Sequence, residues 1–161
     1  MAIDARTAVA RGGARRAEWF NDYAVGDTVV SPVVTIATED VRSYSRFTND
    51  VRPVFHSTTT VDSAPVPQLF LFSLGIALLL HGAGTYIPRY FVAFFGFDVI
   101  EFHQDVRTGA SIRSVAVVSA MAERGSNGLI TYEHRTTLAD DGPVLVTSTH
   151  RILVERRGAD D

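Results

Sequence analysis

The chain has 161 residues, the usual size of one domain, and 46% of them are hydrophobic, so we expect one folded core rather than a disordered chain. It contains no cysteine and no lysine, which excludes disulfides, thiolate nucleophiles, cysteine metal sites and lysine Schiff bases. The net charge of −3 gives no basic surface of the kind that nucleic acids need, and we expect no nucleic-acid partner.

The first seventeen residues differ in charge from the rest of the chain. Residues 1–17 hold four arginines and one aspartate, a charge of +3, which leaves −6 for the remainder. The segment has no apolar core of the length that a secretory signal requires. We interpret 1–17 as a disordered leader, 18–157 as a single domain and 158–161 as a short tail.

A strand and a short helix are predicted next. Thr28–Ile36 is rich in valine and threonine, and Pro32 within it is typical of an edge strand or a bulge. Thr38 is placed to cap a helix with acidic residues in its first turn. The apolar stripe of that helix, at positions i, i+3 and i+6, consists of Val41, Tyr44 and Phe47.

The middle of the chain holds a long segment without charge. No Asp, Glu, Arg or Lys occurs between Ser63 and Pro88, but the unbroken apolar stretch is only Leu69–Leu80. Such a stretch is about 18 Å long as a helix, too short to span a membrane. We predict a buried central helix over Gln68–Leu80, in which Gly75 marks a close crossing, since a mid-helix glycine otherwise costs roughly 1 kcal/mol.

Three consecutive antiparallel strands are predicted in the last third of the chain, over Ile112–Met121, Leu129–Leu138 and Val144–Val154. Turn sequences at 125–128 and 140–142 separate them. A helix that is apolar on all sides must be covered by protein, and in a small domain a curled sheet does this most simply. The predicted fold class is α+β: an antiparallel sheet wrapped around one long buried helix, the hot-dog fold.

Several segments resemble one enzyme family in order along the chain. Trp19–Asp27 and Thr35–Val41 are similar to the opening of MaoC-like dehydratases and (R)-specific enoyl-CoA hydratases. Tyr44–His56 resembles their motif Gly-Asp-x-Asn-Pro-aliphatic-His. Phe94–Phe102 and Val106–Gly109 resemble a family strand and its Val-x-x-Gly-Asp turn. The resemblance covers residues 19–156 and implies a hot-dog hydratase or dehydratase that needs no cofactor and no metal.

The resemblance assigns catalysis to Asp50 and His56. A water held between the Asp50 carboxylate and the His56 imidazole would add to C3 of an α,β-unsaturated thioester, or leave from C3 of a 3-hydroxyacyl thioester, while one of the pair exchanges the C2 proton. Which of the two acts as acid and which as base stays open. This chain departs from the motif: His56 is six residues after Asp50 rather than five, Asn49 replaces the glycine, and Arg52 stands where the family has asparagine.

Substrate contacts are expected from Arg52 and from the start of the central helix. Backbone N–H groups near Gln68 or Leu69 would bind the enolate oxygen, because free N–H groups and the helix dipole favour negative charge there. Pro67-Gln68 stands where the family usually has His-Gly. The acyl group would be carried by coenzyme A or an acyl carrier protein. The resemblance also implies a cytoplasmic homodimer with its sheets joined edge to edge, acting in lipid or polyketide metabolism.

Two other functions fit the same fold. A hot-dog thioesterase would use a carboxylate to direct water onto the thioester carbonyl and would need no paired histidine. A non-catalytic acyl-binding protein would need neither residue. No two of the five histidines have a spacing typical of metal ligands, so no metal site is expected. The aromatic residues between Tyr86 and Phe97 are expected in core packing or a subunit interface, and lining of an acyl pocket is the alternative.

Overall fold

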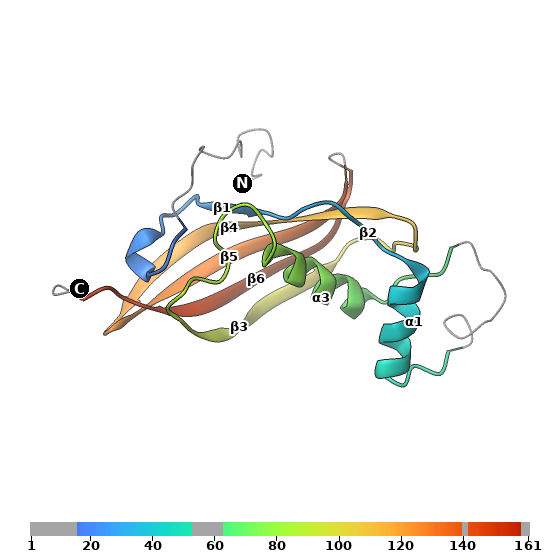
Figure 1. Cartoon of the computed structure of the whole chain (residues 1–161), viewed down its shortest axis with the longest axis horizontal. Helices are drawn as coiled ribbons and strands as arrows, with labels where there is room; N and C mark the ends of the chain where they lie inside the picture. The colour runs from blue at the N-terminus through green and yellow to red at the C-terminus, as the bar shows by residue number, and fades with distance from the viewer. Residues whose placement is uncertain (1–15, 53–62, 140–141, 159–161) are drawn as a thin grey trace.

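The computed structural model describes residues 16–52, 63–139 and 142–158, and in them it shows one antiparallel sheet that curves around a helix (Figure 1). The order of the strands in the sheet is β1-β4-β5-β6-β3, and β2 also pairs with β4. The strands are β1 (Thr28–Val30), β2 (Val34–Thr35), β3 (Phe91–Phe102), β4 (Ser111–Arg124), β5 (Asn127–Leu138) and β6 (Val144–Glu155). The helices are a 3₁₀ turn, η2 (Phe20–Asp22), and the α-helices α1 (Thr38–Phe47) and α3 (Gln68–Leu79).

The three long strands at the end of the chain confirm the prediction and are longer than expected. β4 and β5 pair from Ile112↔Leu138 to Arg124↔Asn127, across a turn at Gly125 where φ is +62°. The predicted strand over 28–36 is divided into β1 and β2. Pro32 lies in the gap between them, as expected for a residue that cannot donate to a ladder.

Helix α3 lies against the concave face of the sheet, as predicted (Figure 1). Its buried residues are Leu71, Gly75, Leu78 and Leu79. A Cβ atom on Gly75 would lie 2.3 Å from Thr136 Oγ1 and 3.1 Å from Ser114 Oγ. The absence of a side chain at Gly75 therefore lets the helix approach the sheet this closely. No helix among the described residues is long and apolar enough to cross a membrane.

The core consists of two apolar clusters separated by polar side chains. One cluster lies towards the C-terminal end of α3 and includes Leu79, Tyr86 and Ile130. The other lies towards its N-terminal end and includes Leu71, Ile112 and Val146. Between the clusters, the inward positions of β4, β5 and β6 carry Ser114, His134, Thr136, Ser148 and His150, all buried. We call these five residues the polar band.

Helix α1 differs from the sequence prediction at both ends. Its N-cap is Ala37 rather than Thr38, because the Asp40 carboxylate accepts the Ala37 N–H at 3.1 Å and the Thr38 hydroxyl is bonded to Thr108 Oγ1. The predicted stripe is buried only at Val41, whereas Phe47 is 89% exposed. The helix extends away from the sheet at one end of the molecule (Figure 1), and its last turn is covered at Ser45 but not at Phe47.

The N-terminal part of the described chain is attached to the body. The Ala17 N–H donates to Thr85 Oγ1 at 3.0 Å, and Ala17 packs against the core. The Trp19 ring stacks on Tyr90 with centroids 3.5 Å apart, and the Arg157 guanidinium lies over Trp19. Residues 1–15 are outside the described residues, so the disordered leader remains a prediction.

Gly75→Ala tests the close contact between helix and sheet. We expect it to lower the free energy of unfolding by about 1–3 kcal/mol, because the new Cβ would overlap Thr136 Oγ1. Thr136→Ala removes that atom, so the double variant should lose less than the sum of the two single losses. Denaturant unfolding of the four proteins measures the coupling. Strictly additive losses would contradict a direct contact at this position.

Candidate active site

The end of α1 places Asp50 in a fixed backbone position. The Asp50 N–H donates to Ser45 O at 2.8 Å and the Asn49 N–H donates to Arg46 O at 3.2 Å, the two bonds of a Schellman motif. Asn49 has a positive φ of 53°, the left-handed conformation that this motif requires. Asparagine adopts it more readily than other residues with a side chain. The change from glycine to Asn49 is therefore compatible with the same helix end.

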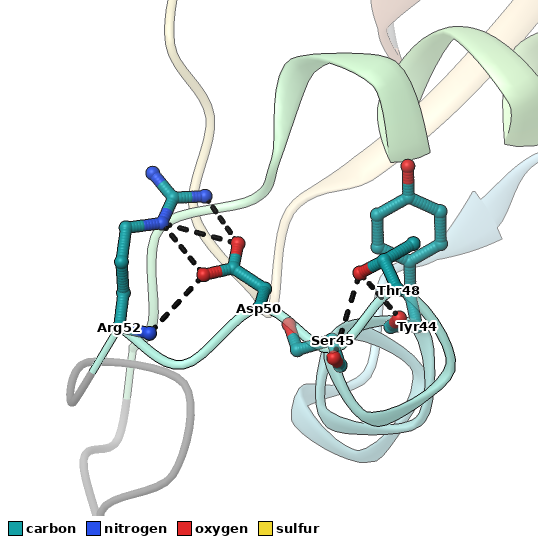
Figure 2. A network of polar contacts seen from close by, with 5 residues as sticks. All are labelled: Tyr44, Ser45, Thr48, Asp50 and Arg52. Atoms are coloured by element: carbon teal, nitrogen blue, oxygen red, sulfur yellow. Dashed lines mark hydrogen bonds and ion pairs between the residues drawn. The ribbon is translucent and has the colours of Figure 1, made fainter.

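The carboxylate of Asp50 is bound by Arg52 (Figure 2). Arg52 Nε lies 2.9 Å from Oδ1 and 3.1 Å from Oδ2, and a terminal guanidinium nitrogen lies 2.5 Å from Oδ2. The backbone N–H of Arg52 also donates to Oδ1 at 3.2 Å. The hydrogen bond to Asp50 raises the pKa of the Arg52 guanidinium above its already high value. Of the predicted site residues, the structure thus brings Asp50 and Arg52 together.

The start of α3 lies near the same end of the molecule. The Tyr44 ring of α1 packs against Phe70 in the first turn of α3, with centroids 5.2 Å apart. Pro67 is the N-cap of α3, and the helix geometry leaves the N–H groups of its first turn, including those of Gln68 and Leu69, without partners inside the helix. The Gln68 side chain donates to Asp105 Oδ1 at 3.3 Å, and Leu69 is 60% exposed.

His56 lies outside the described residues, so its pairing with Asp50 remains a prediction. Within the part of the chain that the structure describes, no three His, Asp or Glu side chains gather closely enough to hold a metal ion. The cluster defined by observed contacts is therefore the Asp50–Arg52 ion pair at the end of α1, the helix whose Tyr44 packs against the first turn of α3. Its groups can orient a water or a substrate hydroxyl and can stabilise a developing negative charge.

The polar band was missed at the sequence level. Its hydroxyl and imidazole groups are joined in a chain: Ser114 Oγ lies 2.9 Å from Thr136 Oγ1, which lies 3.1 Å from His134 Nε2. His134 Nδ1 lies 3.0 Å from Ser148 Oγ. Ser148 and His150 are two residues apart in β6 and therefore share its inner face, but nothing in the sequence spacing indicates that His134 and His150 would meet there.

His150 is fully buried and bonded to a tyrosine. Its Nε2 lies 2.7 Å from the Tyr86 hydroxyl, and its Nδ1 has no hydrogen-bond partner among the described residues. Burial lowers the pKa of His150 from 6.5 to about 4. Burial, with a smaller contribution from His150, lowers the pKa of His134 to about 3. Both imidazoles are therefore neutral at physiological pH and act as hydrogen-bonding groups of the core.

Sequence comparison and structure comparison give different results. No family model and no curated protein matches the sequence. Among solved structures, a MaoC-like dehydratase from Rhodospirillum rubrum matches with a TM-score of 0.69 at 17% identity, over 87% of this chain and 98% of that one. This chain has the hot-dog fold of the MaoC-like dehydratases and (R)-hydratases.

Two further structures with this fold match the chain. The unliganded (R)-hydratase PhaJ1 from Pseudomonas aeruginosa matches with a TM-score of 0.66 at 14% identity, covering 88% of each chain. The HadBC (3R)-hydroxyacyl-ACP dehydratase complex from Mycobacterium tuberculosis matches with a TM-score of 0.57 at 19% identity, over 80% of this chain and 96% of that one. At these identities the similarity establishes the fold but does not assign a reaction to this chain.

The two buried histidines predict how stability depends on pH. In the unfolded chain they bind protons below about pH 6.5, whereas in the fold they stay neutral until about pH 4 and about pH 3. Protons therefore favour the unfolded state, and each histidine should lower the free energy of unfolding by roughly 1 kcal/mol per pH unit on acidification below pH 6.5.

Substitution separates this effect from the titration of carboxylates. His134→Gln or His150→Gln should each make the decline between pH 6.5 and 4 shallower, whatever their stability at neutral pH. The control Ala120→Gln, at an exposed position without a titratable group, should leave the slope unchanged. Urea unfolding at several pH values measures all four slopes. If the histidine variants keep the wild-type slope, these imidazoles are not neutral in the fold.

Proposed function

We propose that this protein is a hydratase or dehydratase that adds water to an α,β-unsaturated acyl thioester, or removes it from a 3-hydroxyacyl thioester. The observation that carries the proposal is the Asp50 carboxylate, fixed at the end of α1 in a hot-dog fold in which Tyr44 of the same helix packs against the first turn of α3. The reaction needs a proton acceptor and donor near C2 and C3, and hydrogen-bond donors at the thioester oxygen.

In the hydration direction, Asp50 and His56 would hold the water whose oxygen forms the new bond to C3. The water loses one proton to this pair, and C2 gains one proton from it, so the elements of water are added across the double bond. Negative charge develops on the thioester oxygen between these events. The N–H groups at the start of α3, near Gln68 and Leu69, would stabilise it, since the positive end of a helix dipole favours an anion.

We propose only the class of acyl carrier, one that presents the acyl group as a thioester. Coenzyme A and acyl carrier protein both present the acyl group as a thioester, and a structural neighbour is named as a (3R)-hydroxyacyl-ACP dehydratase. Arg52 is the cationic side chain of the proposed site, and we place it at the edge of the bound substrate. The proposed cellular location is the cytoplasm, where these thioesters are formed and consumed.

Asp50→Asn and His56→Ala test the catalytic assignment. With the best enoyl thioester of a chain-length series, each should reduce kcat/KM by about two to four orders of magnitude, the scale for losing a positioned acid or base. The loss of enoyl absorbance measures the rate. Glu123→Gln serves as a control, because Glu123 is an exposed carboxylate on β4 that pairs with Arg156, far along the chain from the site.

Other outcomes of the same assay would favour the other functions. Release of free thiol from saturated acyl thioesters, without a change in enoyl absorbance, would make the protein a thioesterase. Saturable binding of acyl thioesters with neither reaction would make it an acyl-binding protein. Wild-type turnover by Asp50→Asn would remove Asp50 from the mechanism even if hydration is observed.

The exposed surface of α3 supports the proposed homodimer. The helix carries no charged residue on any face, yet Leu69 is 60% exposed and Leu80, its C-cap, is 55% exposed in the single chain. A helix that is apolar all round is normally covered by protein on all sides. The sheet of this chain covers only one side of α3, so we infer that the surface of a partner covers the other side.

Strand β3 forms an edge of the sheet and also exposes apolar side chains. It pairs with β6 on one side, and no other described strand pairs with its second side. Its exposed apolar side chains are Val92, Phe94, Phe95, Phe97 and Val99. The Phe94 and Phe97 rings stack, and the Phe97 ring lies 5.2 Å from Phe72 of α3, so these two side chains of β3 adjoin the helix. Phe95 instead lies against Arg151. We propose that a second copy covers the surface formed by these two side chains and the exposed side of α3, with the β3 edges of the two sheets adjacent.

Phe94→Glu should disrupt this dimer. Phe94 is 47% exposed in the single chain, so the charged side chain can remain in solvent in a monomer but would be buried in the interface. We expect a monomer for the variant and a dimer for the wild type in sedimentation equilibrium at micromolar concentration. Val25→Glu changes an exposed valine outside this surface and should remain dimeric. A monomeric wild type would contradict the proposed interface.

A further inference from the structure

Asp50 is held both through its main chain and through its carboxylate. On the main-chain side, the hydrogen bonds from Asp50 N–H to Ser45 O and from Asn49 N–H to Arg46 O fix the backbone at the end of α1. On the side-chain side, both carboxylate oxygens accept hydrogen bonds from Arg52. Little freedom is left to either torsion of the Asp50 side chain while both sets of contacts persist.

Arg52 uses its main chain and its side chain on the same group. Its backbone N–H donates to Oδ1 at 3.2 Å, the closure of an Asx turn, while its Nε and a terminal nitrogen contact Oδ1 and Oδ2. An arginine fork matches the two oxygens of a carboxylate in a way that a lysine ammonium does not. The spacing of two residues therefore gives one side chain control over the direction of the carboxylate.

We propose that Arg52 is a positioning residue for Asp50, holding its carboxylate ionised and aiming its oxygens at the reacting water. This inference rests on the proposed function for the reacting water, but the effect on the carboxylate does not depend on it. Arg52 acts through Asp50 and forms or breaks no bond in the reaction. Its role adds to the substrate contact proposed above, because the same guanidinium can border the substrate while it binds the carboxylate.

The exposure of the two side chains shows what the pair can do. The Asp50 side chain is 19% exposed and the Arg52 side chain is 62% exposed, so the ion pair lies at the surface and the guanidinium is its more exposed member. An ion pair this open to solvent contributes little to folding. Variants at Arg52 should therefore fold, and their effects should be seen in the ionisation and orientation of Asp50.

The direction of the effect follows from the charges. A guanidinium remains protonated throughout the accessible pH range, and a positive charge in contact with a carboxylate favours its ionised form. Loss of the guanidinium should make Asp50 take up its proton at higher pH. Lysine keeps the charge but not the two-pronged contact, so it should restore ionisation better than it restores orientation.

A ¹³C NMR titration of the Asp50 carboxyl carbon in the full chain tests the proposal directly. Aspartate labelling gives the signal, and its absence in Asp50→Asn gives the assignment. We expect the titration midpoint to rise by roughly half a pH unit in Arg52→Gln and by less in Arg52→Lys, a shift consistent with an ion pair that is open to solvent. Arg46→Gln, which breaks an exposed ion pair with Glu39 on the same helix, should leave the midpoint unchanged. Equal midpoints in wild type and Arg52→Gln would overturn the proposal.

The pH dependence of enoyl thioester hydration separates this proposal from the proposed function. In Arg52→Gln, the limb of the rate profile that depends on Asp50 should move to higher pH by the same amount as the NMR midpoint, with kcat reduced about tenfold. Arg52→Lys should return this limb of the pH–rate profile towards its wild-type pH but should not restore the full kcat. A shifted NMR midpoint in a protein that hydrates no thioester would retain the positioning role and reject the hydratase. If Arg52→Gln hydrates the thioester with the wild-type NMR midpoint and the wild-type pH profile, the hydratase is retained and the positioning role of Arg52 is rejected.

Discussion

The charge-free helix α3 can exist in water only if protein covers it, and the rest of the molecule follows from that requirement. The sheet supplies cover on one side, and it can come close because Gly75 has no side chain where Thr136 and Ser114 approach the helix. On the other side, exposed leucines of α3 and phenylalanines of β3 form the surface that we assign to a second copy. The same helix directs its N-terminal N–H groups towards the end of the molecule that holds α1.

The polar band and the proposed active site show two uses of polar groups in one small fold. Under Gly75, the buried Ser114–Thr136–His134–Ser148 chain satisfies its polar groups internally, and its imidazole is neutral because it is buried. At the end of α1, the Asp50 carboxylate lies at the surface and is paired with a cation. Only the second arrangement leaves a charged group accessible to substrate, so we assign the chemistry to it and a structural role to the band.

Much of the fold could be predicted from sequence, because its strongest signals are local. The uncharged segment predicted α3 to within one residue, and the β-rich runs between turn sequences predicted β4, β5 and β6. The Ala37 cap was missed because the competing bond from Thr38 goes to Thr108, seventy residues away. The histidine pair was missed because the pairing register of β5 and β6 brings it together. Asp50 and Arg52 are only two residues apart, but sequence did not predict their contact because its geometry depends on how α1 ends. His56 lies outside the described residues, so its prediction is untested.

The central claim is that Asp50 and the first turn of α3 bind opposite ends of the reacting unit of an acyl thioester. A crystal structure of the His56→Ala variant of the full chain, which should turn over slowly, with a 3-hydroxyacyl thioester of coenzyme A tests this most directly. The account predicts the 3-hydroxyl within about 2.6–3.2 Å of an Asp50 carboxylate oxygen. It also predicts an acyl path that passes the N–H groups of Gln68 and Leu69. An acyl group bound elsewhere, with the Asp50 carboxylate in contact with no part of the ligand, would contradict it.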